Sequence, residues 1–149
     1  IASVKDNGNN NVTVTLQNRL PHKLPTGAPF RNIFLKVTAT DKDGKVVFTN
    51  TKSHPLKDDK KSVLFLALGG ADGKPSAPPK ATQILNDSRL SPHEIREIVY
   101  HVPLSATNVK AEAYYALLLP PIVKKFDKKI ADTELKKPHL IGTAVMDLK

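Results

Sequence analysis

The segment Asn18–Gly27, with the sequence N-R-L-P-H-K-L-P-T-G, holds the residue best suited to chemistry. Its histidine, His22, stands between Pro21 and Pro25. Proline fixes its own φ at about −65° and restricts the residue before it, so the imidazole sits on a stiffened loop. A histidine held in this way suits a metal or haem iron. The simpler alternative is a loop histidine whose ring bonds a neighbouring carbonyl.

The other histidines form no recognisable metal site. They are scattered and show neither H-x-H nor H-x-x-x-H spacing, so zinc would need distant loops to converge; they are His54, His93, His101 and His139. Copper needs soft ligands, and Met146 is the one methionine. The chain contains no cysteine, which excludes disulfides, thiolate sites and covalent haem attachment within it.

A second charged segment, Asp87–Glu94, reads D-S-R-L-S-P-H-E. Arg89 can pair with Asp87 or with Glu94, and Pro92 fixes the start of the next strand. Such a cluster usually fixes the conformation of a loop, although it is charged enough to be a functional site. The sequence has no G-x-S-x-G elbow and no P-loop, because Pro75 stands where the serine or threonine should be. No catalytic set is found, and we expect the protein not to be an enzyme.

Alternating apolar and polar residues predict the elements that position these segments. Strands are expected at residues 12–17, 32–40, 46–49, 62–68, 81–85, 95–102, 110–119 and 139–148. Asp41–Gly44 is typical of a hairpin turn, and residues 122–130 suit one short amphipathic helix. The pattern predicts an all-β fold, an immunoglobulin-like Greek-key β-sandwich of about seven strands with one short helix. Residues 1–10 are expected to be a linker or ragged start, and residues 11–149 a single domain.

The chain has 149 residues and a formal net charge of +9, mostly from lysine. Lysine lacks the guanidinium fork that reads phosphates, so a solvated basic surface is the simplest interpretation. Docking to an acidic redox protein comes next, ahead of nucleic acid or anionic lipid. With 5% aromatic residues and no tryptophan, a stacking platform is excluded, and we expect no nucleic-acid partner. The most apolar stretch, 111–123, is interrupted by prolines and too short to span a membrane.

Three segments in order carry a family resemblance. They are residues 12–46, which include H-K-L-P-T-G, then Asp87–Pro103, and finally the Y-Y-A-L-L-L-P-P run of residues 114–121. Together they resemble the β-sandwich domain at the C-terminal end of bacterial multihaem c-type cytochromes. The resemblance covers roughly residues 11–125, and H-K-L-P-T-G is its most specific part.

The resemblance implies that a cytochrome domain of the same parent polypeptide precedes the sandwich and binds the haems. It implies that His22 can approach one haem c of that domain as a distal axial ligand, giving a low-spin haem without an open site. Arg31 could face a haem propionate, while Pro25, Thr26 and Gly27 would shape the loop. The family often has glycine where this chain has Pro21.

The leading hypothesis is therefore a non-catalytic accessory domain of a periplasmic or extracellular bacterial cytochrome, serving electron transfer. The chain begins with Ile1, which is expected of a processed product or an excised domain. The alternative is an immunoglobulin-like adhesion or assembly module of an exported protein, with no haem. A hydrolase or metalloenzyme is a third reading, because sandwich folds host many functions.

Overall fold

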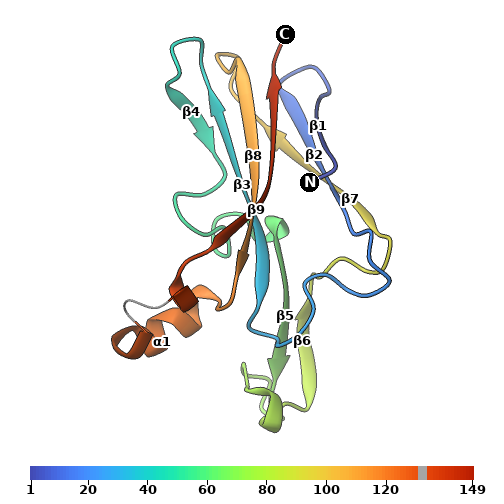
Figure 1. Ribbon diagram of the computed structural model, residues 1–149, viewed down its shortest axis with the longest axis vertical. Helices are drawn as coiled ribbons and strands as arrows, with labels where there is room; N and C mark the ends of the chain where they lie inside the picture. The colour runs from blue at the N-terminus through green and yellow to red at the C-terminus, as the bar shows by residue number, and fades with distance from the viewer. Residues whose placement is uncertain (131–133) are drawn as a thin grey trace.

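The computed structural model describes residues 1–130 and 134–149, and Figure 1 shows it as an elongated, strand-rich molecule. Within the described residues it contains nine strands and one short α-helix. The strands are β1 Ser3–Asp6, β2 Asn11–Gln17, β3 Asn32–Thr40, β4 Val46–Thr49, β5 Val63–Gly69, β6 Gln83–Asp87, β7 Ile95–His101, β8 Asn108–Ala116 and β9 His139–Asp147. Helix α1 spans Pro120–Ile130, and three 3-10 turns cover Lys60–Ser62, Pro78–Lys80 and Glu134–Lys136.

The strands form two antiparallel sheets. One has three strands in the order β1-β2-β7, and the other has six, in the order β6-β5-β3-β8-β9 with β4 also paired to β3. Strand β3 pairs with β8 along its whole length, from Asn32↔Ala116 to Thr40↔Asn108. Its other edge is shared, because β5 pairs with its beginning and β4 with its end. The predicted β-sandwich is confirmed.

The core lies between the two sheets and follows from period-two alternation, since successive strand side chains point to opposite faces. Val12, Val14 and Leu16 of β2 point inward and are at most 5% exposed, as the sequence pattern predicts. Fully burying a side chain of this kind contributes about 1.5–3 kcal/mol. The facing residues of the larger sheet include Leu35, Val37, Val109 and Ala111, all at most 1% exposed.

A second, smaller apolar cluster contains residues from β3, β5 and β8. It consists of Phe34, Val63, Phe65 and Ala116, with Leu56, Ala67, Tyr114 and Leu119 packed against them. Phe34 stacks on Tyr114 with ring centroids 5.4 Å apart. This cluster holds the loop 50–62 and the segment before α1 against the larger sheet.

The structure differs from the predicted elements at several points. Ser3–Asp6, within the expected linker or ragged start, form β1 because their backbone pairs with β2, as in Val4↔Val14. The count is therefore nine strands rather than about seven. Helix α1 begins at Pro120 rather than at Ile122, since proline is well tolerated in the first helical turn. Among the described residues, no helix combines the length and apolar character needed to cross a bilayer.

The β5–β6 hairpin extends beyond the rest of the sandwich, at the bottom of Figure 1. Only the first residues of β5 pair with β3, through Asn32↔Phe65, Ile33↔Leu64 and Phe34↔Val63. Further along, from Leu66↔Asp87 to Gly69↔Gln83, β5 is paired with β6 alone. We call residues 66–87 the arm.

Candidate functional site

The structure brings together the two motif segments that lie far apart in the sequence. Loop 18–31, between β2 and β3, lies against turn 87–94, between β6 and β7. Leu24 and Leu90 exchange two backbone hydrogen bonds of 2.9 Å, and Lys23 Nζ lies 2.7 Å from an Asp87 carboxylate oxygen. We call residues 18–31 and 87–94 the loop cluster.

Asn18 joins the two halves of the loop cluster. Its side chain is fully buried, and its amide nitrogen donates to the carbonyls of His22 at 2.7 Å and Ser91 at 2.9 Å. Its backbone N–H donates to Glu94 O at 2.9 Å. The sequence analysis missed Asn18, although an asparagine directly after a strand commonly hydrogen-bonds a turn backbone.

His22 is exposed, and its ring lies beside its own loop. Nδ1 is 3.3 Å from the carbonyl oxygen of Lys23. Because a carbonyl can only accept, this hydrogen bond needs a proton on Nδ1, and in the neutral ring the lone pair is then on Nε2. Nε2 has no hydrogen-bond partner within the described chain. A neutral imidazole oriented by a backbone carbonyl is the form in which histidine binds metals.

The Pro25-Thr26-Gly27 turn places a cation on the same loop. Pro25 is buried and follows a cis peptide bond, while Thr26 is exposed. Gly27 has φ +88°, and a Cβ there would lie only 2.8 Å from Nη1 of Arg31. Glycine therefore accommodates both the left-handed backbone and the guanidinium that lies over it. Arg31 is exposed and forms no ion pair within the described residues.

The charged groups of turn 87–94 contact one another. Arg89 donates two hydrogen bonds to Asp87, at 2.8 and 2.9 Å, and with Lys23 it holds the pKa of Asp87 well below its usual range. Arg89 does not pair with Glu94, whose partner is Arg96 at 2.6 Å. Burial raises the pKa of Glu94, but hydrogen bonds from Ser91 N–H and Arg96 outweigh it and lower that pKa overall.

The rest of this turn is shaped by its backbone. The N–H of Glu94 donates to Ser91 O at 3.1 Å, which closes the turn around Pro92 and His93. His93 has φ +59°. Pro92 and His93 are both exposed at the surface of the loop cluster.

His54 is half-buried and has a structural environment. Its Nδ1 accepts from Leu56 N–H at 3.2 Å, so Nε2 carries the proton and donates to Asn32 Oδ1 at 2.9 Å. Its ring centroid is 4.3 Å from that of Phe34. Burial lowers the pKa of His54 to about 4, which keeps it neutral. No group of three or more metal-ligating side chains occurs in the described part of the chain.

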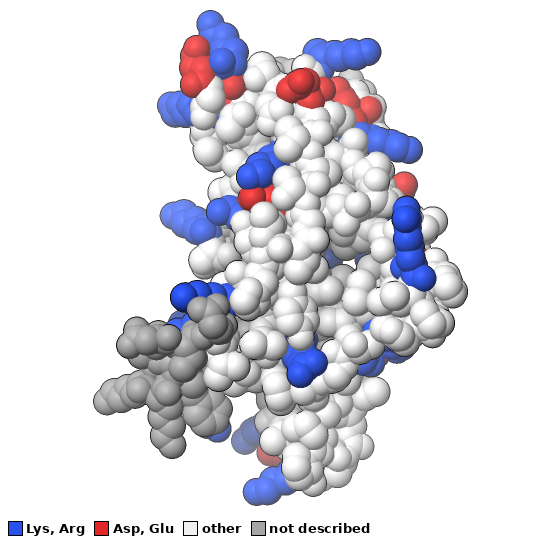
Figure 2. Space-filling view, in the orientation of Figure 1, with Lys and Arg blue, Asp and Glu red and all other residues white. Residues whose placement is uncertain are grey.

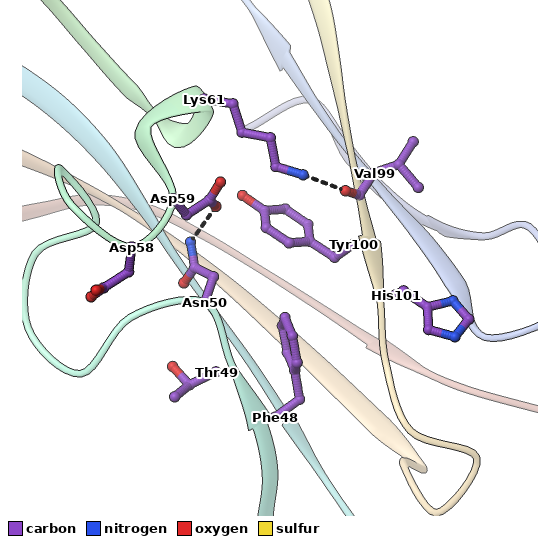
Figure 3. A pocket seen from close by; sticks show the side chains of 9 residues that line it. All are labelled: Phe48, Thr49, Asn50, Asp58, Asp59, Lys61, Val99, Tyr100 and His101. Atoms are coloured by element: carbon purple, nitrogen blue, oxygen red, sulfur yellow. Dashed lines mark hydrogen bonds between the residues drawn. The ribbon is translucent and has the colours of Figure 1, made fainter.

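A shallow hollow of about 350 Å³ opens between β4, loop 50–62 and β7 (Figure 3). Lys61 Nζ lies 4.8 Å from the Tyr100 ring centroid and donates to Val99 O at 2.8 Å. The Tyr100 hydroxyl is buried without a hydrogen-bond partner in the described chain, and burial raises its pKa. The sequence analysis did not find this hollow. Of the histidines named there, His101 lines it, and no lining nucleophile is paired with a base.

The whole chain has a solved structural neighbour. The crystal structure of a penta-heme cytochrome c552 from Thermochromatium tepidum matches 98% of this chain, with a TM-score of 0.85 and 40% sequence identity. This chain is a β-domain similar to part of that multihaem cytochrome. The match covers 38% of that neighbour, so the chain spans well under half of the cytochrome's length. No protein-family model matches the sequence, and neither does any curated protein.

The similarity to a multihaem cytochrome makes the loop cluster the stronger of the two candidate sites, ahead of the hollow beside Tyr100. A cytochrome-related domain without cysteine holds no covalently attached haem c of its own. Its loop cluster, however, presents an exposed imidazole and an exposed guanidinium on one loop. In general, an imidazole can ligate a metal and a guanidinium can pair with carboxylates.

Proposed function

We propose that this chain is a non-catalytic accessory domain of a multihaem c-type cytochrome and caps a haem carried by another part of the same polypeptide. The whole-chain similarity to a penta-heme cytochrome supports this role, as does the coverage of only 38% of that protein. The haems would be attached outside residues 1–149, because covalent attachment needs thiols that this chain lacks.

In this role His22 supplies a distal axial ligand. The observation that carries the proposal is the free Nε2 of an exposed imidazole whose Nδ1 faces the Lys23 carbonyl at 3.3 Å. The loop is held by the Leu24–Leu90 backbone pair and by Asn18, so the ligand is positioned before any haem approaches. With histidine on both faces of the iron, the haem would transfer electrons and bind no substrate.

Arg31 has a second function in the same arrangement. Its guanidinium is exposed and can donate a bidentate pair of hydrogen bonds to a haem propionate. On the face seen in Figure 2, lysine and arginine side chains are spread out rather than gathered into one patch. We assign this distributed charge to a solvated surface that also attracts an acidic redox partner, in a periplasmic or extracellular location.

The test is the spectrum of the natural full-length polypeptide and of its His22→Ala variant. We expect a Soret band and sharp α and β bands on reduction in the wild type. In His22→Ala, electron paramagnetic resonance should show one ferric haem changing from low to high spin. His101→Ala is the matched control, because His101 is also exposed and its ring hydrogen-bonds the Asn11 side chain at 3.3 Å.

Each result has a separate meaning. An unchanged spin state in His22→Ala would disprove ligation by this histidine. A polypeptide without any haem spectrum would disprove the capping role and favour the adhesion or assembly module.

A further inference from the structure

The arm meets the rest of the sandwich near its base, where Ala67 packs against the smaller apolar cluster. Strand β6 is hydrogen-bonded to β5 alone, and four of its five residues are exposed on a strand that presents both faces. Ile84 is 63% exposed and Leu85 is 39% exposed. A two-stranded hairpin is marginally stable in water by itself, so a hairpin with exposed aliphatic side chains is a candidate contact element.

The arm is nevertheless well organised. At its tip, Gln83 Nε2 donates to Gly70 O at 2.6 Å, and Gly70 N–H donates to Lys74 O at 2.9 Å. The Leu85 side chain covers Gly69 so closely that a Cβ there would lie 2.7 Å from it. These contacts order the arm within the chain, so its apolar side chains are positioned before any partner binds.

The base of the arm belongs to the same structural unit as the His22 loop. Asp87 is the last residue of β6 and pairs with Lys23 at 2.7 Å. The Ser88 hydroxyl donates to Val63 O at 2.7 Å and accepts from Phe65 N–H at 3.1 Å. By register, Arg31 stands one position before the Asn32↔Phe65 pair, beside the point where the arm leaves the sandwich.

The resulting surface combines apolar side chains with unpaired cations. Figure 2 shows that the face of the arm turned to the viewer carries few charged groups. Arg31, beside the base of the arm, is exposed and forms no ion pair within the described residues, and the same holds for Arg19 elsewhere in loop 18–31. A haem at a protein surface has the complementary chemistry, because an apolar macrocycle edge carries two carboxylates.

We propose that the arm is a second docking contact for the haem-bearing part of the cytochrome, with Ile84 and Leu85 packed against it. This proposal rests on the proposed function and names a surface separate from His22. A second copy of this chain is a poorer occupant, because two chains of net charge +9 would bring like charges together at the arm base.

Hydroxyl-radical footprinting of the natural full-length holoprotein tests the proposal without any substitution. Ile141 and Leu140 of β9 are matched references, since they are the same residue types with exposures of 55% and 53%. Within this chain Ile84 is more exposed than Ile141. It should therefore react at least as fast as Ile141 if nothing covers the arm. We expect Ile84 to react at least threefold more slowly than Ile141, and Leu85 at least threefold more slowly than Leu140.

The outcomes distinguish docking of the arm from haem ligation by His22 and from contact with a second copy of the chain. Equal or faster reaction of Ile84 overturns the proposal. Protection that disappears on dilution also overturns it, because it would identify a second copy. Protection in a polypeptide that lacks haem overturns the stated partner. Protection that persists on dilution in a haem-containing polypeptide supports the arm contact, even where His22→Ala leaves the spin state unchanged.

A substitution provides a second readout. Ile84→Asp should expose the arm and increase trypsin cleavage after Lys80 severalfold in the holoprotein, while Ile141→Asp should not. Equal cleavage in wild type, Ile84→Asp and Ile141→Asp would contradict docking through Ile84.

Discussion

The buried amide of Asn18 donates a 2.7 Å hydrogen bond to the main-chain carbonyl of His22. The same amide nitrogen bonds Ser91 O at 2.9 Å, 73 positions further along the chain. The orientation of the loop that carries His22 therefore depends on the turn at Ser91, which Asn18 bonds at the same time.

Replacing Asn18 by alanine should destabilise the protein by about 3 kcal/mol, because buried carbonyls would lose their donor without gaining access to water. Equilibrium denaturation in urea measures this change. Asn108→Ala is the control, since that amide contacts Asp147 at the surface, and it should change stability by about 0.5 kcal/mol or less. Equal losses in the two variants would show that Asn18 does not anchor the loop cluster.

Gly27→Ala should be only slightly costlier than the same change at Gly73, because the exposed Arg31 guanidinium can rotate away from the new Cβ. Both glycines have positive φ, at +88° and +74°, so both variants carry backbone strain of about 1–2 kcal/mol. Only at Gly27 would the new Cβ meet a side chain, Arg31, at 2.8 Å; at Gly73 nothing lies within 4 Å. In an Arg31→Ala background the extra cost at Gly27 should disappear. If it persists, the guanidinium does not occupy that space.

Stability should fall as the pH is lowered from about 6.5 to about 4, because of His54. Burial lowers its pKa to about 4 in the folded protein, against 6.5 as its ordinary value, so the unfolded chain binds more protons in this interval. The destabilisation by His54 is absent above about pH 6.5 and reaches its full size below about pH 4. We expect a loss of about 1.5 kcal/mol, roughly half of what the full pKa shift would give, since the ring is partly exposed.

His54→Gln should remove this part of the pH dependence, measured as the urea midpoint at several pH values. The carboxylates Asp87 and Glu94 have lowered pKa values, so their contributions are lost only below about pH 4.5 and do not overlap most of this interval. A slope between pH 6.5 and 4.5 that is the same in wild type and His54→Gln would contradict the role of His54.

Tyr100→Phe should change stability by less than about 1 kcal/mol, because the buried hydroxyl has no hydrogen-bond partner in the described chain to lose. Tyr100→Ala should cost about 3–5 kcal/mol, since the ring is 4% exposed and packs edge-on against Phe48. Thermal unfolding of both variants measures these effects. A loss above about 2 kcal/mol in Tyr100→Phe would mean that the hydroxyl binds a group such as the Asp59 carboxylate.

Much of the fold could be predicted from local patterns. The Asp41–Gly44 turn and the strands that flank it were recognisable because Gly44 supplies the positive φ of +77° that the turn uses. The inward set of β7, with Ile98 and Tyr100 at 4% exposure, also followed from alternation. Strand β1 was not predictable, since four polar and mixed residues become a strand only through pairing with β2.

The sequence by itself determined the β-sandwich, the absence of covalent haem attachment and the stiff loop around His22, because alternation, cysteine content and proline act locally. It did not determine which partners the charged residues would choose. Only the tertiary structure decided that Lys23 reaches the Asp87 carboxylate and that Asn18 lies between two loops. The physical reason is that such contacts depend on the packing of two sheets, which brings together residues more than 60 positions apart.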